Sequence, residues 1–328
     1  MKATSSTFLI FCFSSSPSTV IAFAPAKAPA SKPKLNERPP TALNVNLVTF
    51  DLDDTIFPVG PVVHDANVAL INHLATLGCP TTQENFLEST KLIRSSLANP
   101  ITYTELRHRA IRMELEKHLD SADILDEQVT GAYDLWEDHR HMAAERHLYH
   151  DTIAMLSELR SNHPEAVIAA ITNAKGNPLR MKSIEDYFDF CVSGEDDDVF
   201  PLRKPHEGIY NVAIKRYEEL SVEKETKGIN AKDFCWVHVG DDLANDVGAS
   251  AKCGAYAIWV DLDDEYNQAA SSKREPRAAQ PAWSTATKEE LEKRKEMNQQ
   301  AQQYVSARVT KLAKLPNAIQ SITASVRQ

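Results

Sequence analysis

The stretch Val45-Asn46-Leu47-Val48-Thr49-Phe50-Asp51-Leu52-Asp53-Asp54-Thr55 decides the fold of this chain. Its first half is a short apolar run typical of a buried parallel strand, and the run ends on carboxylates spaced two residues apart. In parallel α/β sheets, ligands bind just beyond the carboxyl ends of the strands. We therefore expect Asp51 and Asp53 to face a ligand site. The alternative is an acidic turn that caps a helix, since Asp and Thr favour both positions.

Three later segments favour the ligand site. Two are apolar runs, 167–171 and 235–239, that end on polar side chains, and the third is a lysine before a helical stretch that begins near residue 207. The polar residues of these segments are Thr172, Asn173, Lys204, Asp241, Asp242 and Asp246. Because the carboxyl ends of parallel strands meet at one edge of a sheet, we expect these residues to gather around Asp51.

The order of these motifs resembles the four motifs of the haloacid dehalogenase (HAD) superfamily. An Asp-x-Asp, a Thr, a Lys and a second Asp cluster follow one another, and the resemblance covers residues 46–262 and the tail from about Tyr304. It implies an α/β fold with a doubly wound parallel-sheet HAD core and an inserted helical cap domain. Each motif is short, but four in the right order form a specific signal.

The apolar pattern divides the chain into segments. Residues 65–147 carry helical spacing and lack strand-like runs, which predicts a helical cap between core segments 45–64 and 148–262. Residues 263–303 are rich in Glu, Lys, Arg, Gln, Ala and Pro, which predicts a polar insertion, either a loop or a solvated helix, without catalytic residues. Residues 304–328 resemble the closing strand and helix of HAD cores.

Composition limits the classes of partner. The 328-residue chain has a formal charge of −10, so nucleic acid is not expected as a partner, since phosphate backbones require a basic surface. Its five cysteines are far apart without a C-x-x-C pair, which favours reduced thiols over disulfides or a zinc site. No apolar run has the length of a transmembrane helix, so we expect no membrane contact of the mature protein.

The segment 1–44 has the composition of a targeting presequence, which we expect to be disordered. It contains no Asp or Glu before Glu37, and a short apolar run at 8–13 follows Lys2. The following Ala22-Phe23-Ala24-Pro25 resembles the junction in the two-part presequence of algae with complex plastids. This resemblance implies import into the plastid stroma. The secretory pathway is the alternative, which the cysteine pattern does not favour.

The HAD resemblance also implies a mechanism. Asp51 would attack the phosphorus of a phosphate monoester to form an aspartyl-phosphate, and Asp53 would protonate the leaving alkoxide and later deprotonate the hydrolytic water. Asp51 and Asp241 would hold Mg²⁺ together with the backbone carbonyl of Asp53. Asp246 would support the metal site or the motif lysine, and Asp242 is the weaker candidate for a metal ligand.

The phosphoryl group and the leaving group would be held by different parts of the chain. Thr172, the backbone amide of Asn173, and Lys204 would bind the phosphoryl oxygens. Contacts to the leaving group would come from the cap, where Arg107 and Arg109 are candidates. A solvated helix face explains these two arginines equally well.

The implied function is a Mg²⁺-dependent phosphatase that acts on a small phosphorylated metabolite. The stretches 48–55, 170–173 and 238–248 are similar to bacterial flavin-pathway phosphatases that act on FMN and on 5-amino-6-(5-phospho-ribitylamino)uracil. Phosphoglycolate or another sugar phosphate is the alternative substrate. A phosphotransferase would keep every motif, whereas a haloalkanoate dehalogenase would lack the second acid, Asp53.

Overall fold

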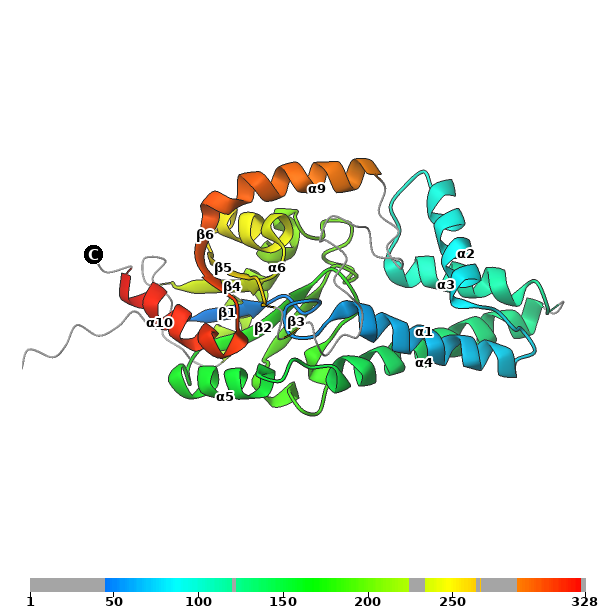
Figure 1. Cartoon of the computed structure of the whole chain (residues 1–328), viewed down its shortest axis with the longest axis horizontal. Coiled ribbons are helices and arrows are strands. Elements are labelled where there is room, and N and C mark those ends of the chain that lie inside the picture. Colours follow the sequence, from blue (N-terminus) through cyan, green and yellow to red (C-terminus); the bar gives the residue numbers. More distant parts are fainter. Residues whose placement is uncertain (1–44, 120–121, 224–233, 264–265, 267–287, 326–328) are drawn as a thin grey trace, which may run out of the picture. The chain divides into compact units, whose positions relative to one another are not determined.

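The computed structural model describes residues 45–119, 122–223, 234–263, 266 and 288–325 (Figure 1). The expected presequence 1–44 lies outside the described residues, as does most of the expected insertion before residue 288. The described residues form an α/β core and a group of helices beside it.

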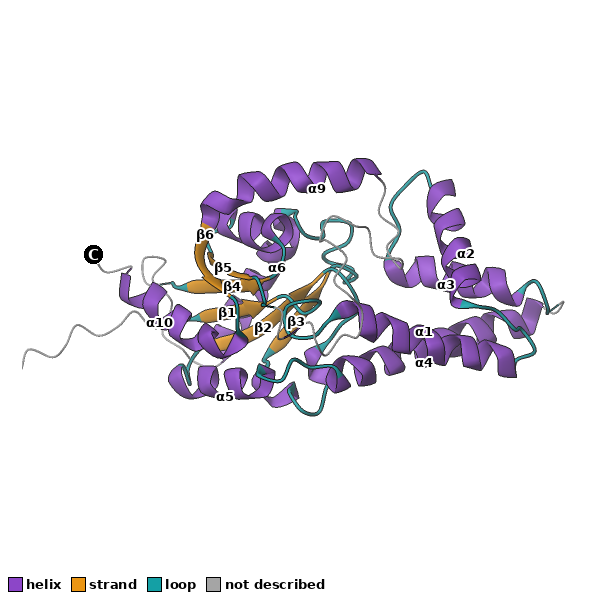
Figure 2. Cartoon of the chain, viewed as in Figure 1, coloured by secondary structure: helices purple, strands orange, loops and turns teal. Residues whose placement is uncertain are grey.

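A six-stranded parallel sheet forms the core, in the order β3-β2-β1-β4-β5-β6 (Figure 2). The strands are β1 (Leu47–Phe50), β2 (Val167–Thr172), β3 (Phe190–Ser193), β4 (Trp236–Gly240), β5 (Tyr256–Val260) and β6 (Val305–Val309). The chain winds outward from β1 through β2 and β3, and then returns to place β4 on the other side of β1. The crevice beyond β1 and β4 is therefore the switch point at which α/β sheets bind ligands.

The described helices divide into a cap group and a core group. The cap helices are α1 (Val59–Thr76), α2 (Gln83–Ser96), α3 (Tyr103–Leu115) and α4 (Ala122–Arg146). The core helices are α5 (Thr152–Asn162), α6 (Glu207–Glu223), α7 (Ala249–Lys252), α9 (Lys288–Ala301) and α10 (Leu315–Ser325). The short helical segments are η1 (Pro178–Arg180), η2 (Glu185–Tyr187), η3 (Leu243–Gly248), η4 (Gln302–Tyr304) and η5 (Leu312–Lys314).

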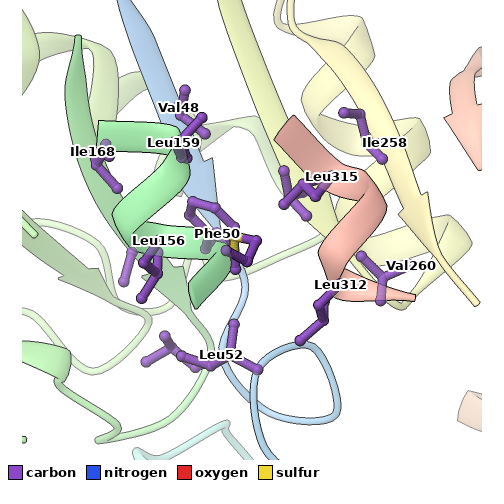
Figure 3. Close-up of a cluster of buried hydrophobic side chains, with 14 of the residues drawn as sticks. Val48, Phe50, Leu52, Leu156, Leu159, Ile168, Ile258, Val260, Leu312 and Leu315 are labelled. Carbon is purple, nitrogen blue, oxygen red and sulfur yellow. The ribbon is translucent and has the colours of Figure 1, made fainter. Parts of the chain in front are cut away.

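Helices cover both faces of the sheet. Val48 and Phe50 of β1 share a buried cluster with Leu156 of α5 (Figure 3), and α10 contributes to the same cluster. Leu47, whose side chain points to the opposite face, belongs to a second cluster with Tyr210 of α6. A parallel sheet buried on both faces explains why its strands read as continuous apolar runs. The predicted doubly wound α/β fold is confirmed.

The cap helices have a hydrophobic cluster of their own. Ala66, Leu70 and Leu74 lie four residues apart on one side of α1, where they join Ile111 and Leu115 of α3 in this cluster. Figure 1 shows α1 running beside α4, against which it packs. The cap therefore has its own packed interior beside the core.

Local hydrogen bonds determine where the cap helices begin. Thr82 and Thr102 precede α2 and α3, and each side chain accepts a hydrogen bond from the backbone N–H three residues later. The first cap helix begins at Val59, ahead of the domain boundary expected at residue 65, and the Val59 N–H donates to Asp54 Oδ1 at 2.9 Å. The cap thus starts directly from the turn that carries the Asp-x-Asp motif.

Helix α9 is the described part of the polar region expected at 263–303. It is a polar helix, but one side of it packs on η3: Ala301 shares a buried cluster with Leu243 and Val247. The helix is therefore attached to the segment that follows β4. None of the described helices combines the length and the hydrophobicity needed to cross a bilayer.

Candidate active site

The turn after β1 is fixed at both ends. The Asp51 N–H donates to the carbonyl of Val239 in β4 at 2.8 Å, so the Asp51 side chain is held at the crevice between the two strands. Asp54 has a φ of 61°, a left-handed conformation that Asp tolerates better than most residues. This turn redirects the chain into α1 and leaves Asp51 8% exposed.

Three carboxylates converge at this crevice. Asp51, Asp241 and Asp246 each offer an oxygen, and these oxygens lie within 4.8 Å of one another. Gly240 makes the convergence possible, because a Cβ at this position would lie 2.4 Å from the Cβ of Asp246. The glycine at the end of β4 therefore allows η3 to bring Asp246 back beside Asp241.

Lys204 joins two of these carboxylates. Its Nζ lies 2.6 Å from Asp51 Oδ1 and 2.8 Å from Asp246 Oδ1, and its side chain is 2% exposed. The side chain of Asn173 holds the Lys204 backbone, since its Nδ2 donates to the Lys204 carbonyl at 3.0 Å and its Oδ1 accepts from the Lys204 N–H at 2.8 Å. The loop after β2 thus fixes the lysine on the acidic cluster.

Two threonines complete the first layer of hydrogen bonds. Thr172 is buried at the end of β2, and its Oγ1 accepts from the Ala174 N–H at 3.2 Å. Thr55 donates to Asp51 Oδ2 at 3.2 Å and accepts from the Asp241 N–H at 3.1 Å, so it links the two strand ends. Thr55 belongs to the stretch 45–55 that predicts the fold, but the sequence alone does not show that this threonine links the two strand ends.

The cluster is short of positive charge. Burial raises the pKa of Asp51 to about 8, even though Lys204 acts to lower it. Burial and the neighbouring carboxylates raise the pKa of Asp241 well above its usual value. Burial also acts to raise the pKa of Asp246, but Lys204 and His238 outweigh burial and hold that pKa below its usual range. One lysine therefore does not neutralise the three acids.

This donor set fits Mg²⁺. The ion prefers carboxylate oxygens, water and substrate oxygens in an octahedral arrangement, and it tolerates several open positions for water. Asp51, Asp241 and Asp246 supply oxygens without a histidine or cysteine in the group, which disfavours zinc. A divalent cation would also offset the negative charge of three carboxylates that share one lysine.

The Asp53 carboxylate lies outside this group of three. It accepts hydrogen bonds from Arg140 Nη2, at 2.9 Å to Oδ1 and 3.2 Å to Oδ2. Arg140 belongs to α4, so the contact joins the cap to the motif turn. Sequence reasoning missed Arg140, because nothing in the polar run of this helix distinguishes it from its charged neighbours.

Asp242 makes contacts different from those of Asp241. Its Oδ1 accepts from the Asn245 N–H at 2.7 Å and so caps η3, while its Oδ2 accepts from Arg294 Nε at 2.8 Å. Arg294 lies on α9, in the region expected to carry no catalytic residues. Both Asp242 oxygens are thus occupied by η3 and α9, and a cation of the insertion lies close enough to Asp241 for the two charges to interact.

The two cap arginines lie in different surroundings. The Arg107 guanidinium stacks on the Trp136 ring at 3.6 Å and donates to Asn67 Oδ1 at 3.1 Å, and burial lowers the pKa of Arg107 to about 9. Arg107 lines a cavity of about 250 Å³ between α1, α2 and α3. Arg109 is exposed and pairs with Glu105 at 2.7 Å. The structure therefore does not bring the two arginines together.

Known proteins resemble this chain in sequence and in fold. Over 218 residues it is 23% identical to the 5-amino-6-(5-phospho-D-ribitylamino)uracil phosphatase YigB of Escherichia coli, covering 66% of this chain and 83% of the relative. Over 253 residues it is 24% identical to a ribulose-1,5-bisphosphate 5-phosphatase of Halopiger xanaduensis, covering 74% and 96%. A 2-haloacid dehalogenase from Pseudomonas syringae has a similar structure, with a TM-score of 0.58 at 22% identity, covering 84% of this chain and 99% of that one.

The family model of haloacid dehalogenase-like hydrolases matches residues 45–254, which include the motif turn, the cap and the first four strands of the sheet. The match covers more than half of the 328-residue chain. The protein belongs to the haloacid dehalogenase-like hydrolases.

Proposed function

We propose that this hydrolase is a Mg²⁺-dependent phosphomonoester phosphatase in which Asp51 is the nucleophile. The observation that carries the proposal is the convergence of Asp51 with two further carboxylates and with Lys204 at the switch point of the sheet. A carboxylate attacks a phosphate ester only where cations offset the repulsion between negative oxygens. This crevice provides one such cation, Lys204, and the ligands for a second.

The roles of the residues follow from their contacts. Asp51 attacks phosphorus and the alkoxide leaves, which gives an aspartyl-phosphate that water then hydrolyses. Asp53 gives its proton to the leaving oxygen in the first step and takes a proton from the water in the second. Lys204 and Thr172 stabilise the phosphoryl oxygens. The chemistry that bound Mg²⁺ supplies is charge neutralisation of the same oxygens.

The names of the two phosphatase relatives suggest a substrate class. One name describes a 5-phosphate on a ribityl chain, and the other describes removal of a 5-phosphate from ribulose-1,5-bisphosphate. Both are primary phosphates on polyhydroxylated five-carbon chains. FMN also carries a ribityl phosphate, so we place flavin-pathway phosphates first. Other sugar phosphates, together with phosphoglycolate, come second.

A substrate screen tests this proposal. Protein that begins near Asn44 would be incubated with Mg²⁺ and with FMN, the ribitylaminouracil phosphate, pentose 5-phosphates, phosphoglycolate and p-nitrophenyl phosphate, and phosphate release would be measured. We expect the ribityl phosphates to have the highest kcat/KM and excess EDTA to stop turnover. The Asp51→Asn variant, purified in parallel, controls for contaminating phosphatases. Full activity in EDTA would refute the Mg²⁺ mechanism.

We further propose delivery to the plastid stroma, on the sequence of residues 1–44 alone, which lie outside the described residues. A fluorescent protein fused behind residues 1–45 should enter the plastid in an alga with complex plastids. The Phe23→Ala fusion should remain outside the stroma. Uniform cytosolic fluorescence of the unchanged fusion would refute this delivery, and fluorescence in the medium would favour secretion.

A further inference from the structure

A buried arginine of the cap is in contact with the proposed acid-base residue. Arg140 on α4 has a side chain that is 3% exposed, and its Nη2 donates to both oxygens of Asp53. Among the described residues, no other group donates a hydrogen bond to the Asp53 carboxylate. The orientation of this carboxylate therefore depends on one side chain that the cap supplies.

The guanidinium sits in a narrow space at the motif turn. A Cβ at Gly176 would lie 2.9 Å from Arg140 Nη1 and 3.2 Å from the side chain of Leu52, so a side chain at this point of the loop would crowd the guanidinium. Nη1 is buried and has no hydrogen-bond partner within the described part of the chain. An unpaired buried nitrogen costs stability, so Nη1 lowers the net contribution of Arg140 to folding.

The segment of α4 that carries Arg140 is attached to the core. The neighbouring His141 Nε2 accepts from the Asn177 N–H at 3.2 Å, and Glu145 Oε1 accepts from the Ser183 N–H at 2.7 Å. Both contacts are made to the loop that follows β2. The neighbours of Arg140 on α4 thus hold this part of the helix on the core loop, which places the guanidinium beside Asp53.

A free Asp53 carboxylate would have competing partners nearby. It is close enough to Asp51 for its charge to act on that residue, and Lys204 and the metal ligands meet at the same place. A carboxylate that turned toward Lys204 would no longer face the leaving oxygen. A general acid works only within hydrogen-bond reach of the atom that it protonates.

We propose that Arg140 is a positioning residue that holds the Asp53 carboxylate in the orientation for proton transfer and away from Lys204. Before the step, Asp53 carries its proton on the oxygen that faces the leaving group and accepts from Arg140 on the other. The proton moves to the leaving oxygen as the phosphorus–oxygen bond breaks, and Asp53 is left as the carboxylate to which the protonated Arg140 donates through both oxygens. The proposal rests on the phosphatase function proposed above. In this proposal, proton transfer by Asp53 depends on a side chain of the cap, whereas nucleophilic attack by Asp51 depends on residues of the core.

The test compares two leaving groups. Arg140→Gln and the milder Arg140→Lys would be assayed with ribose 5-phosphate, whose alkoxide needs a proton to leave, and with p-nitrophenyl phosphate, whose phenolate leaves without one. We expect Arg140→Gln to lower kcat/KM for ribose 5-phosphate by about 100-fold and for p-nitrophenyl phosphate by less than about threefold. Arg140→Lys should recover part of the loss. Arg146→Gln, on the exposed side of the same helix, is the matched control and should change neither value.

Three outcomes would overturn the proposal. They are equal losses on both substrates in a variant with the wild-type circular dichroism spectrum, no loss on either substrate, and a loss matched by Arg146→Gln. Wild-type protein without activity on any phosphate ester would instead refute the phosphatase function. In that event, thermal unfolding of Arg140→Gln, Asp53→Asn and the double variant would show whether the two side chains stabilise each other. Coupling in the free energy of unfolding, without any activity, would mean that the pair has a structural role.

Discussion

The two aspartates of the motif turn are each paired with a buried cation, but the cations come from different regions. Lys204 belongs to the core, bridges Asp51 to Asp246, and has its backbone held by Asn173. Arg140 belongs to the cap and pairs with Asp53 alone. The proposed nucleophile, Asp51, is therefore fixed by the sheet and its loops, whereas the proposed acid-base residue, Asp53, is fixed across the boundary between core and cap.

The largest effect on activity should distinguish the role of Asp51 from that of Asp53. Asp51→Asn removes the nucleophile, so hydrolysis of p-nitrophenyl phosphate should fall to background. Asp53→Asn leaves attack on this activated ester intact but slows hydrolysis of the aspartyl-phosphate. A stopped-flow trace should then show one equivalent of nitrophenolate followed by slow turnover. Steady turnover without a burst, at the wild-type rate, would remove Asp53 from the mechanism.

Lys204→Met tests the core half of the comparison. The change leaves Asp51 and Asp246 buried without their cation, which we expect to cost about 3–5 kcal/mol of unfolding free energy and nearly all activity. Mg²⁺ should raise the melting temperature of this variant more than that of wild type, because the cluster has gained negative charge. Lys204→Arg keeps the charge and is the control. Wild-type stability of Lys204→Met would show that the bridge contributes little.

Lowering the pH should weaken the attachment of α4, which carries Arg140. Burial lowers the pKa of His141 below its usual value of 6.5, and its Nε2 accepts a hydrogen bond that only the neutral ring can accept. Below pH 6.5 the unfolded chain binds more protons than the folded one, so stability is present above pH 6.5 and is lost as the pH falls. The loss from one histidine is at most about 1.4 kcal/mol per pH unit.

Urea unfolding of wild type and His141→Gln between pH 7.5 and 5 measures this contribution. The difference between the two proteins isolates His141 from His108, His163 and His238, whose pKa values burial also lowers. Parallel curves over the whole range would mean that His141 does not titrate in this window.

The smallest effect is expected at a third region, the insertion helix α9. Arg294 pairs with Asp242 next to Asp241, the proposed metal ligand, but the Arg294 side chain is 49% exposed, so solvent screens the pair. Arg294→Ala removes a positive charge beside the acidic cluster, so it should strengthen Mg²⁺ binding by about two- to threefold by calorimetry. Lys293→Ala, its exposed neighbour, should leave Mg²⁺ binding unchanged. A tenfold or larger loss would give the insertion a direct part in the metal site.

Sequence reasoning worked best where chemistry sits at the ends of strands. The apolar runs predicted the parallel core, and the structure brings Asp51, Lys204, Asp241 and Asp246 together as the strand-end rule requires. It worked less well in the cap. The helical spacing indicated helices there, but the arginine that reaches the motif turn is Arg140 rather than Arg107 or Arg109. A residue at the carboxyl end of a parallel strand must face the ligand crevice. A polar helix carries several Arg and Lys residues, and the sequence does not show which of them faces the site.

By itself, the sequence determined the parallel α/β fold, the family and the residue types at the crevice. Apolar strands and short motifs are formed by residues that are adjacent in the chain, so both can be recognised in the sequence. Only the tertiary structure decided which cation meets which carboxylate. Asp53 and Arg140 are separated by 87 positions, and Asp242 and Arg294 by 52. No periodicity spans such distances, and a charged side chain looks the same in sequence whether it is solvated or buried against a partner. The packing of α4 on the loop after β2 brings Arg140 to Asp53, and the packing of α9 on η3 brings Arg294 to Asp242.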